Sequence, residues 1–407
     1  MHFSVGIDVS KGKSTVCVLA ETGEVVRTPY EITHTKKNLE TLVTQITGYG
    51  ANEDVRVILE ATGAYSVPVQ QYLQSKGIFV CCVNPLIMKE FIKADNNFRR
   101  VKTDSSDAVH IASYGLQRWY SLKETITCSE DAGIYRQMRE LGRNYHSIQK
   151  PCTELIQHLD HIIDQVMPGI KKEFGGYNSV TGKDPLTDFV KVFWHYDYIT
   201  SMGPKKFNER FRKWAKEKGY HLRKDKPGKV YQLAREGIPT LECNANTKLQ
   251  VTQAAEAVLG IHKALYQILT QLRDIAITRP EYSVIRAMPG VGDTLAPLLV
   301  AEVGDPRKYH SGAALVAYMG IDVPPEESGQ FKAKNKKITR KGSRYLRKLG
   351  YLVIDSLKAI KPEKDTAVYD CLMKKRQQGK PYKVAVVAAM NKFYRIYYAR
   401  AMEAYSS

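Results

Sequence analysis

Alternating apolar and polar positions dominate the first part of the chain. Every second residue of Val5–Val9 is apolar, with Gly6 and Asp8 between them, which is the two-residue period of a strand. A turn at Gly12 leads into a second apolar run, Thr15–Leu19, so the two segments predict a hairpin. The pattern continues to about residue 120 as strand, helix, strand, helix, strand and a last helix. It predicts an α/β domain with five strands.

The middle of the chain follows a different period. Apolar residues recur there in steps of three and four, which is typical of the contact line of a coiled coil. Two long helices are therefore expected to pack as a hairpin, against another subunit, or both. Two ordinary core helices are an equally good account of the second, shorter run. The first run contains Ile134, Met138, Leu141, Tyr145, Ile148, Cys152, Leu155, Leu159, Ile162 and Val166, and the second contains Val258, Ile261, Leu265, Ile268, Leu272 and Ile275.

Residues 168 to about 245 interrupt this helical pattern. They are first rich in glycine and then basic and aromatic, with eleven Lys or Arg against three acids over residues 205–229. We interpret the segment as an inserted module. Basic side chains that alternate with Phe207, Phe211 and Trp214 suit single-stranded nucleic acid. A solvated amphipathic helix explains the same pattern nearly as well.

The last part of the chain carries two signals for phosphate binding. Met288–Gly292 followed by an apolar helix predicts a helix-hairpin-helix, in which the amides near Gly290 and Gly292 approach a phosphate. A run from Phe331 to Gly350 has nine basic residues and no acid, which favours phosphate contact over a purely solvated surface. These basic residues are Lys332, Lys334, Lys336, Lys337, Arg340, Lys341, Arg344, Arg347 and Lys348.

The changes of pattern predict three domains. The first is the α/β domain, residues 1–122. The second, residues 123–280, consists of the coiled-coil helices with the basic insertion at about 168–245. The third, residues 281–407, is mainly α-helical and contains the helix-hairpin-helix.

The charge of the chain narrows the class of partner. A formal net charge of +19 and a pI near 9.4 favour a polyanion, either nucleic acid or an acidic membrane. The longest apolar run, Val384–Met390, is too short to span a bilayer, and Asp8 and Lys11 interrupt any signal peptide. Seven cysteines without a zinc-site spacing suggest buried thiols of a cytosolic protein. Nucleic acid is therefore the expected partner and the cytoplasm the expected location.

Four carboxylates are candidates for a metal site. Asp8 lies within the first strand and Glu60 at the end of the fourth, and these strands are neighbours in a sheet of the RNase H type. Asp104 and Asp107 share one face of a helix. Two like charges about 4 Å apart repel by roughly 4 kcal/mol at an effective dielectric of 20, so such a set needs cations. Mg²⁺, which prefers oxygen ligands, is the expected ion.

Each carboxylate also has a simpler explanation when taken alone. The aspartate pair could cap its helix, and Glu60 could be a solvated strand end. An aspartate on a first strand before a hairpin also begins the phosphate loop of actin-like ATPases. That fold needs a second copy of the hairpin, and the sequence shows none.

Six short motifs together resemble the transposases of the IS110 family of bacterial insertion sequences. They are Gly6–Lys11, Leu59–Tyr65, Lys102–Ala108, Met288–Gly292, Gly320–Gly329 and Ile338–Arg347, in the family's order. The resemblance implies a RuvC-like domain of the RNase H fold whose carboxylate set is Asp8, Glu60, Asp104 and Asp107. It also implies a serine nucleophile in a P-x-x-x-S-G segment, here Ser328. Where many relatives have a second serine, this chain has Glu327.

The resemblance implies a DNA recombinase guided by a structured RNA of its own element. Such an enzyme would bind target and donor DNA, form a covalent phosphoserine link and work as a dimer that assembles further into a tetramer. It would associate with the nucleoid when active. Two alternatives remain open: a metal-dependent, structure-selective nuclease such as a junction resolvase, with Ser328 incidental, and a non-catalytic nucleic-acid-binding protein.

Overall fold

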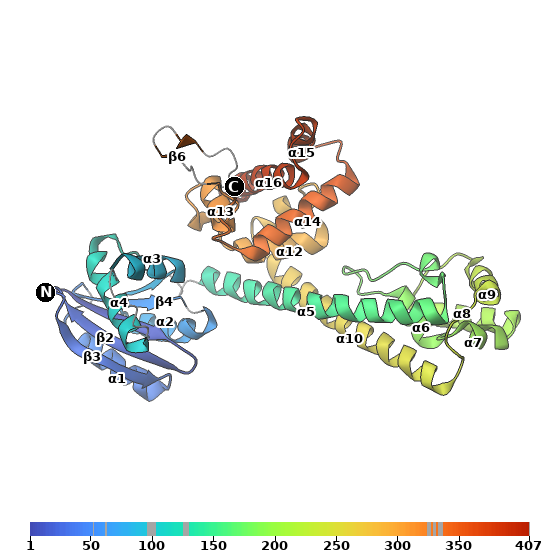
Figure 1. Cartoon of the computed structure of the whole chain (residues 1–407), viewed down its shortest axis with the longest axis horizontal. Helices are drawn as coiled ribbons and strands as arrows, with labels where there is room; N and C mark the ends of the chain where they lie inside the picture. The colour runs from blue at the N-terminus through green and yellow to red at the C-terminus, as the bar shows by residue number, and fades with distance from the viewer. Residues whose placement is uncertain are drawn as a thin grey trace. The chain divides into compact units, whose positions relative to one another are not determined.

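The computed structural model describes residues 1–51, 53–61, 63–95, 103–124, 130–323, 327–328, 331–332 and 337–406. For residues 327–328 and 331–332 the description is of the backbone alone. The chain divides into two compact units, Met1–Gly133 and Ile134–Ser407 (Figure 1).

The first unit is built on a five-stranded sheet in the order β3-β2-β1-β4-β5. β1 pairs antiparallel with β2 and parallel with β4, and β5 is parallel to β4. The predicted element order and the RNase H-type neighbourhood of the first and fourth strands are both confirmed. The strands are β1 (Phe3–Val9), β2 (Lys13–Ala20), β3 (Val25–Thr33), β4 (Val55–Glu60) and β5 (Val80–Val83). The helices are α1 (Lys36–Thr47), α2 (Ser66–Ser75), α3 (Pro85–Asp95) and α4 (Asp104–Gln117), with short 3₁₀ turns at Gly63–Tyr65 and Trp119–Ser121.

The two faces of this sheet are covered differently. Val5, Ile7 and Val9 belong to a core with α1 and α2. Because side chains alternate along a strand, Gly6 and Asp8 face the other side. On that side Ile58 of β4 packs with Ile111 of α4, together with residues of β5 and α3. Asp8 therefore faces the layer that contains α4.

The described residues of the second unit are helical apart from one short hairpin. Its long helices are α5 (Glu130–Val166), whose first residues lie in the first unit, and α10 (Ala245–Ala276). Between them lie a 3₁₀ turn (Ile170–Glu173), α6 (Pro185–Val192), α7 (Tyr196–Ser201), α8 (Pro204–Glu217) and α9 (Lys226–Glu236). After α10 come α11 (Tyr282–Arg286), α12 (Gly292–Val303), a 3₁₀ turn (Pro306–Lys308), α13 (Gly312–Met319), β6 (Glu327–Ser328), β7 (Phe331–Lys332), α14 (Arg344–Ile360), α15 (Ala367–Gln377) and α16 (Tyr382–Ser406).

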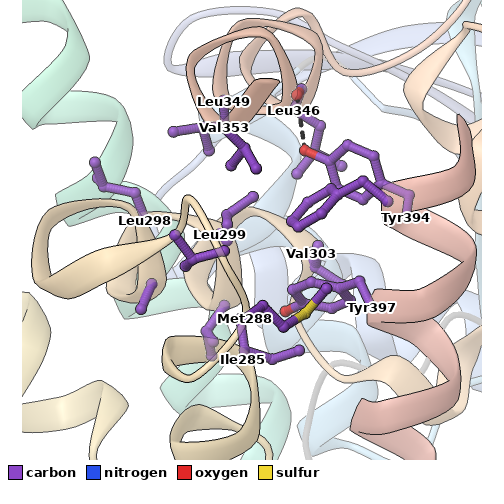
Figure 2. Close-up of a cluster of buried hydrophobic side chains, with 14 of the residues drawn as sticks. Ile285, Met288, Leu298, Leu299, Val303, Leu346, Leu349, Val353, Tyr394 and Tyr397 are labelled. Carbon is purple, nitrogen blue, oxygen red and sulfur yellow. Dashed lines mark hydrogen bonds between the residues drawn. The ribbon is translucent and has the colours of Figure 1, made fainter. Parts of the chain in front are cut away.

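Two hydrophobic cores run along α5 and α10. The N-terminal half of α5 and the C-terminal half of α10 pack with helices α11–α16. Figure 2 shows the part of this core that contains Leu298 and Leu299 of α12, Leu346 of α14 and Tyr394 of α16. The hydroxyl of Tyr394 donates to the Leu346 carbonyl at 2.8 Å. The other halves of α5 and α10 pack with the inserted module. Each helix thus contributes one half to each core, and the two helices run in opposite directions, as in a hairpin. The coiled-coil supercoil and the division into three domains stay predictions.

The aromatic residues of the insertion are core residues. Phe207, Phe211 and Trp214 of α8 are all at most 4% exposed and pack with Phe189 and Phe193. Their spacing of four and three places them on one helix face, with the basic residues on the other. The expectation that these three aromatics stack on single-stranded nucleic acid is therefore wrong, and α8 is the amphipathic helix of the alternative interpretation.

Two expectations about cysteines and membranes can be compared with the described residues. Cys17, Cys81 and Cys152 are buried thiols, as predicted, whereas Cys243 is exposed. Cys128 lies outside the described residues. Within the described ranges, no helix combines the length and the apolar character that a membrane span requires.

Candidate functional site

The register of β1 and β4 places Asp8 beside Glu60. Ile7 lies opposite Leu59 in the parallel ladder, so the next residue of each strand is one of the two carboxylates. Both side chains are half-buried. Because neighbouring strands lie about 4.8 Å apart, the two carboxylates share one end of the sheet and one face.

Helix α4 brings Asp104 to the same end of the sheet. A side chain at Gly6 would overlap the carbonyl of Ala108 and the amide of Ala112, so the helix backbone rests directly on β1. Further along α4, Gly115 lies against Ser4 and Ile58. The helix therefore runs opposite to β1, and its N-terminal residue, Asp104, lies toward Asp8.

The start of α4 does not need its aspartates as caps. Thr103 accepts a hydrogen bond from the Ser106 amide at 3.1 Å, and the Thr103 amide donates to the Ser106 hydroxyl at 3.1 Å, which makes a capping box. Asp104, which is exposed, and Asp107, which is half-buried, follow in the first turn. Thr103 and Ser106 thus cap the helix, so capping does not explain the presence of Asp104 and Asp107.

Lys13, the first residue of β2, lies at the same end of the sheet. The sequence analysis did not include it among the candidate site residues. Its ammonium bonds Glu31 Oε2 at 2.6 Å. This hydrogen bond and the charge of Glu31 raise the pKa of Lys13, and attraction to Asp104 adds to the shift. The influence of Asp104 on a residue of β2 agrees with the direction of α4 derived from Gly6 and Gly115.

The carboxylates converge without forming a closed ligand set. Among the residues that the structure describes, no three His, Cys, Asp or Glu side chains are grouped closely enough to hold a metal ion. The donor chemistry nevertheless fits a hard divalent cation, because Asp8, Glu60, Asp104 and Asp107 supply only carboxylate oxygens. The residues therefore have the oxygen ligands that such an ion prefers. The backbone also brings Asp8, Glu60 and Asp104 to the same end of the sheet.

Replacing Gly6 by alanine is expected to destabilise the first unit and to impair the site. The new methyl group would overlap the backbone of α4, and such overpacking costs about 1–3 kcal/mol or more. Relief requires α4 to move away from β1, which carries Asp104 away from Asp8. Chemical denaturation measures the loss. Gly48→Ala is the matched control, since its φ is −72° and its nearest neighbours lie at 3.4 Å. Equal stability of the two variants would contradict the close approach.

Ser328 lies in the short hairpin of the second unit. β6 pairs antiparallel with β7, with Ser328 opposite Phe331 and Glu327 opposite Lys332. Only the backbone of these four residues is described, so the structure does not place the Ser328 hydroxyl. Pro324, Pro325 and Gly329 of the serine motif, and Lys334 and Lys336 of the basic run, lie outside the described residues.

The described side chains of the basic run differ in exposure and in hydrogen-bond partners. Lys337, Arg340, Lys341 and Arg344 are exposed. The guanidinium of Arg347, by contrast, donates to the carbonyls of Met319 at 2.6 Å and Gly342 at 3.1 Å. Burial, followed by repulsion from Arg340, lowers the pKa of Arg347. Lys348 donates to Gln149 Oε1 at 2.7 Å. Arg347 and Lys348 therefore bond within the protein, but Lys348 is itself exposed, and Arg344 donates to the Tyr345 hydroxyl at 3.0 Å. Phosphate contact stays a prediction for the whole basic run.

The two glycines of the proposed helix-hairpin-helix have different surroundings. A side chain at Gly290 would lie 2.8 Å from Leu357 Cγ and 2.9 Å from the Val353 carbonyl, so close packing on α14 accounts for this glycine together with its φ of +81°. Gly292 has a φ of +60° and open space around it. Asp293 follows in the first turn of α12. Its hydrogen bond to Arg286 lowers the pKa of Asp293, and the two charges pair with each other at the start of α12.

A buried carboxylate fixes the start of α14, and the sequence analysis missed it. Glu302 is 4% exposed and accepts two bonds from Arg143, at 3.1 and 3.2 Å, and one from Ser343 at 2.8 Å. Ser343 also caps α14 by accepting from the Leu346 amide. The signal in the sequence was an acid within the apolar helix at 295–303. This cluster joins α5, α12 and α14 within the basic run, directly before Arg344.

Comparison with known proteins matches both ends of the chain to one family. A transposase model for the DEDD domain of IS110 elements matches residues 5–168, and a model described as "Transposase IS116/IS110/IS902 family" matches residues 282–369. The chain belongs to the IS110 family of transposases. Both carboxylate pairs and Ser328 lie inside the matched ranges, whereas residues 169–281 lie between them.

One curated relative and two solved structures are similar to this IS110-family transposase. "Insertion element IS110 uncharacterized 43.6 kDa protein" of Streptomyces coelicolor is 21% identical over 292 residues, which are 70% of this chain and 67% of the relative. Thermus thermophilus RuvC is 13% identical, with 30% of this chain and 99% of that chain covered and a TM-score of 0.24. RuvC in complex with a Holliday junction substrate is 12% identical, covers 31% of this chain and all of its own, and gives a TM-score of 0.23. These scores are too low to support an argument, so the fold rests on the strand order.

Proposed function

We propose that this transposase is the recombinase that moves its own insertion element, cutting and rejoining DNA strands through Ser328. A divalent-metal site of Asp8, Glu60, Asp104 and Asp107 completes the reaction centre. The observation that carries the proposal is the register of β1 and β4, which sets Asp8 beside Glu60. The direction of α4 supports it, because it brings Asp104 to the same end.

The carboxylates are proposed to hold Mg²⁺. The ion would stabilise charge on a phosphoryl oxygen and on the departing oxygen. The chain's own contribution is to set Asp8 and Glu60 on rigid neighbouring strands, so that only α4 needs to adjust to complete the ligand set. The exposed position of Asp104 at the first turn of α4 suits such an adjustment.

Ser328 is proposed as the nucleophile. Its Oγ attacks the phosphorus of a DNA phosphodiester, a new Oγ–P bond forms, and the bond from phosphorus to one deoxyribose oxygen breaks. The hydroxyl proton of the serine passes to that departing oxygen. Attack by the hydroxyl of another strand reverses these steps, releases Ser328 and rejoins the DNA. The position of Ser328 at the end of β6, just before the basic run, supports contact with phosphates.

The proposal includes a structured RNA from the element as guide and both target and donor DNA as substrates. A formal charge of +19 supports several polyanionic partners at once. Base pairing can then specify the sequence, while the protein contacts backbone and shape. The active form is proposed as a dimer that assembles into a tetramer, with the carboxylate and serine sites meeting across subunits.

Sequencing the RNA that co-purifies with the protein tests the guidance. We expect one structured transcript of the element to be strongly enriched over bulk cellular RNA. The Asp8→Asn variant should retain the same transcript, because binding does not need the reaction centre. Recovery of bulk RNA alone, in proportion to its abundance, would refute guidance while leaving strand cleavage untouched.

A further inference from the structure

The inserted module carries a basic hollow between α8 and α9, outside both family matches. The hollow has a volume of about 310 Å³. Its basic lining consists of Arg212, Lys216, His221, Arg223 and Lys224, and no acidic residue lines it. All five of these side chains are exposed. Such a concentration of one sign of charge in a concave surface focuses a positive potential.

The acids near the hollow are bound to other cations. Asp188 accepts from Lys218 at 2.6 Å and from the Tyr220 hydroxyl at 2.5 Å. Asp225 pairs with Lys229 at 3.0 Å, a hydrogen bond that lowers the pKa of Asp225.

Within the described part of the chain, Lys216, Arg223 and Lys224 make no ion pair. Arg223 does attract Asp225, but no acid among the described residues pairs with Lys216 or Lys224, so an anionic ligand would relieve the repulsion among the three cations.

The N-terminus of α9 adds to the attraction. Pro227, in the first turn of α9, also lines the hollow. The helix dipole places partial positive charge at this end of α9, although Pro227 has no amide hydrogen and the Lys226 amide donates to the Arg223 carbonyl at 3.1 Å. Arg223 and Lys224 come just before this helix, so side-chain and helix charges act on the same space.

The lining favours backbone phosphates of a duplex over single-stranded bases. Binding of single strands usually relies on exposed aromatic faces. Here Phe211 and Trp214 are buried in the module's core. The Tyr220 ring packs against Trp214 with centroids 5.4 Å apart, and its hydroxyl is bonded to Asp188. A paired helix offers phosphates without requiring stacking.

We propose that this hollow binds backbone phosphates of a nucleic-acid duplex. The inserted module then acts as a second anchoring point, separate from the exposed cations at 337–344. This role does not depend on Ser328 or on the carboxylates.

The test is duplex binding by a triple variant of the full-length protein, measured without divalent metal so that no strand is cut. We expect Lys216→Gln/Arg223→Gln/Lys224→Gln to lower the salt slope of log affinity by roughly two to three units, because each lost phosphate contact contributes about 0.9. Lys172→Gln/Lys206→Gln/Arg235→Gln is the matched control: its three cations are exposed, belong to the same module and do not line the hollow. It should lower the slope by less than about one unit.

Three probes of the same sequence identify the source of the phosphates: a DNA duplex, an RNA duplex and a single strand. A loss confined to DNA or to RNA assigns the anchoring point to that duplex, and an equal loss in both assigns it to the shared backbone. Equal slopes for the triple variant and its control would overturn the proposal, as would a loss seen only with the single strand. Unchanged thermal unfolding of both variants shows that the effect arises from charge.

Discussion

Replacing Asp8 by asparagine should reduce strand cleavage by on the order of 10³-fold, because a metal ligand that stabilises the transition state contributes several kcal/mol. Asparagine keeps the shape of the side chain and removes its charge. Repulsion between Asp8 and Glu60 on neighbouring strands disappears at the same time, so thermal stability should be unchanged or higher. Cleavage of labelled DNA carrying the element's end measures the effect.

The matched control is Glu24→Gln. Glu24 is an exposed carboxylate whose backbone carbonyl accepts from the Ala20 amide. Ala20 pairs with Phe3, so Glu24 lies at the end of β1 opposite to Asp8. This variant should cleave like the wild type. Wild-type cleavage by Asp8→Asn would instead show that the carboxylate end of the sheet is not the reaction centre.

Replacing Ser328 by alanine should abolish cleavage and rejoining while leaving nucleic-acid binding intact. The variant loses the oxygen that attacks phosphorus but none of the charges that hold the phosphates. Ser356→Ala, the same chemical change on α14, should retain activity. Binding and cleavage are measured on the same preparation.

Cleavage that persists in Ser328→Ala would identify water as the nucleophile. The chain would then work as a metal-dependent nuclease, the main alternative raised by the sequence. Loss of both binding and cleavage would point to a misfolded hairpin. Ser328→Cys then separates the two explanations, because a thiol restores a nucleophile in a side chain of nearly the same size.

Periodicity alone predicted the first unit well, because its elements are short and regular. The alternation at Val5–Val9 and the helical pattern at 36–47 are confirmed as β1 and α1. The position of Asp8 beside Glu60 follows from the strand neighbourhood. The closeness of α4 to β1, and hence the approach of Asp104, could not be predicted, because it depends on how Gly6 meets Ala108 in three dimensions.

One error and one untested prediction arose where a residue type suits two environments. Phe207, Phe211 and Trp214 have the spacing of a core stripe, but their basic neighbours suggested a stacking surface. Arg347 belongs to a run without acids, yet it bonds carbonyls at the end of α13 and the start of α14. Sequence alone does not distinguish a basic side chain that bonds a backbone carbonyl from one that is available to bind a phosphate.

Mass spectrometry of the protein–DNA adduct tests the central claim most directly. Wild-type protein is incubated with DNA and Mg²⁺, denatured, and digested with protease and nuclease. The account predicts a nucleotide joined through phosphate to the peptide that contains Ser328, and no such peptide from Asp8→Asn. An adduct on another residue, or efficient cleavage without any adduct, would contradict it.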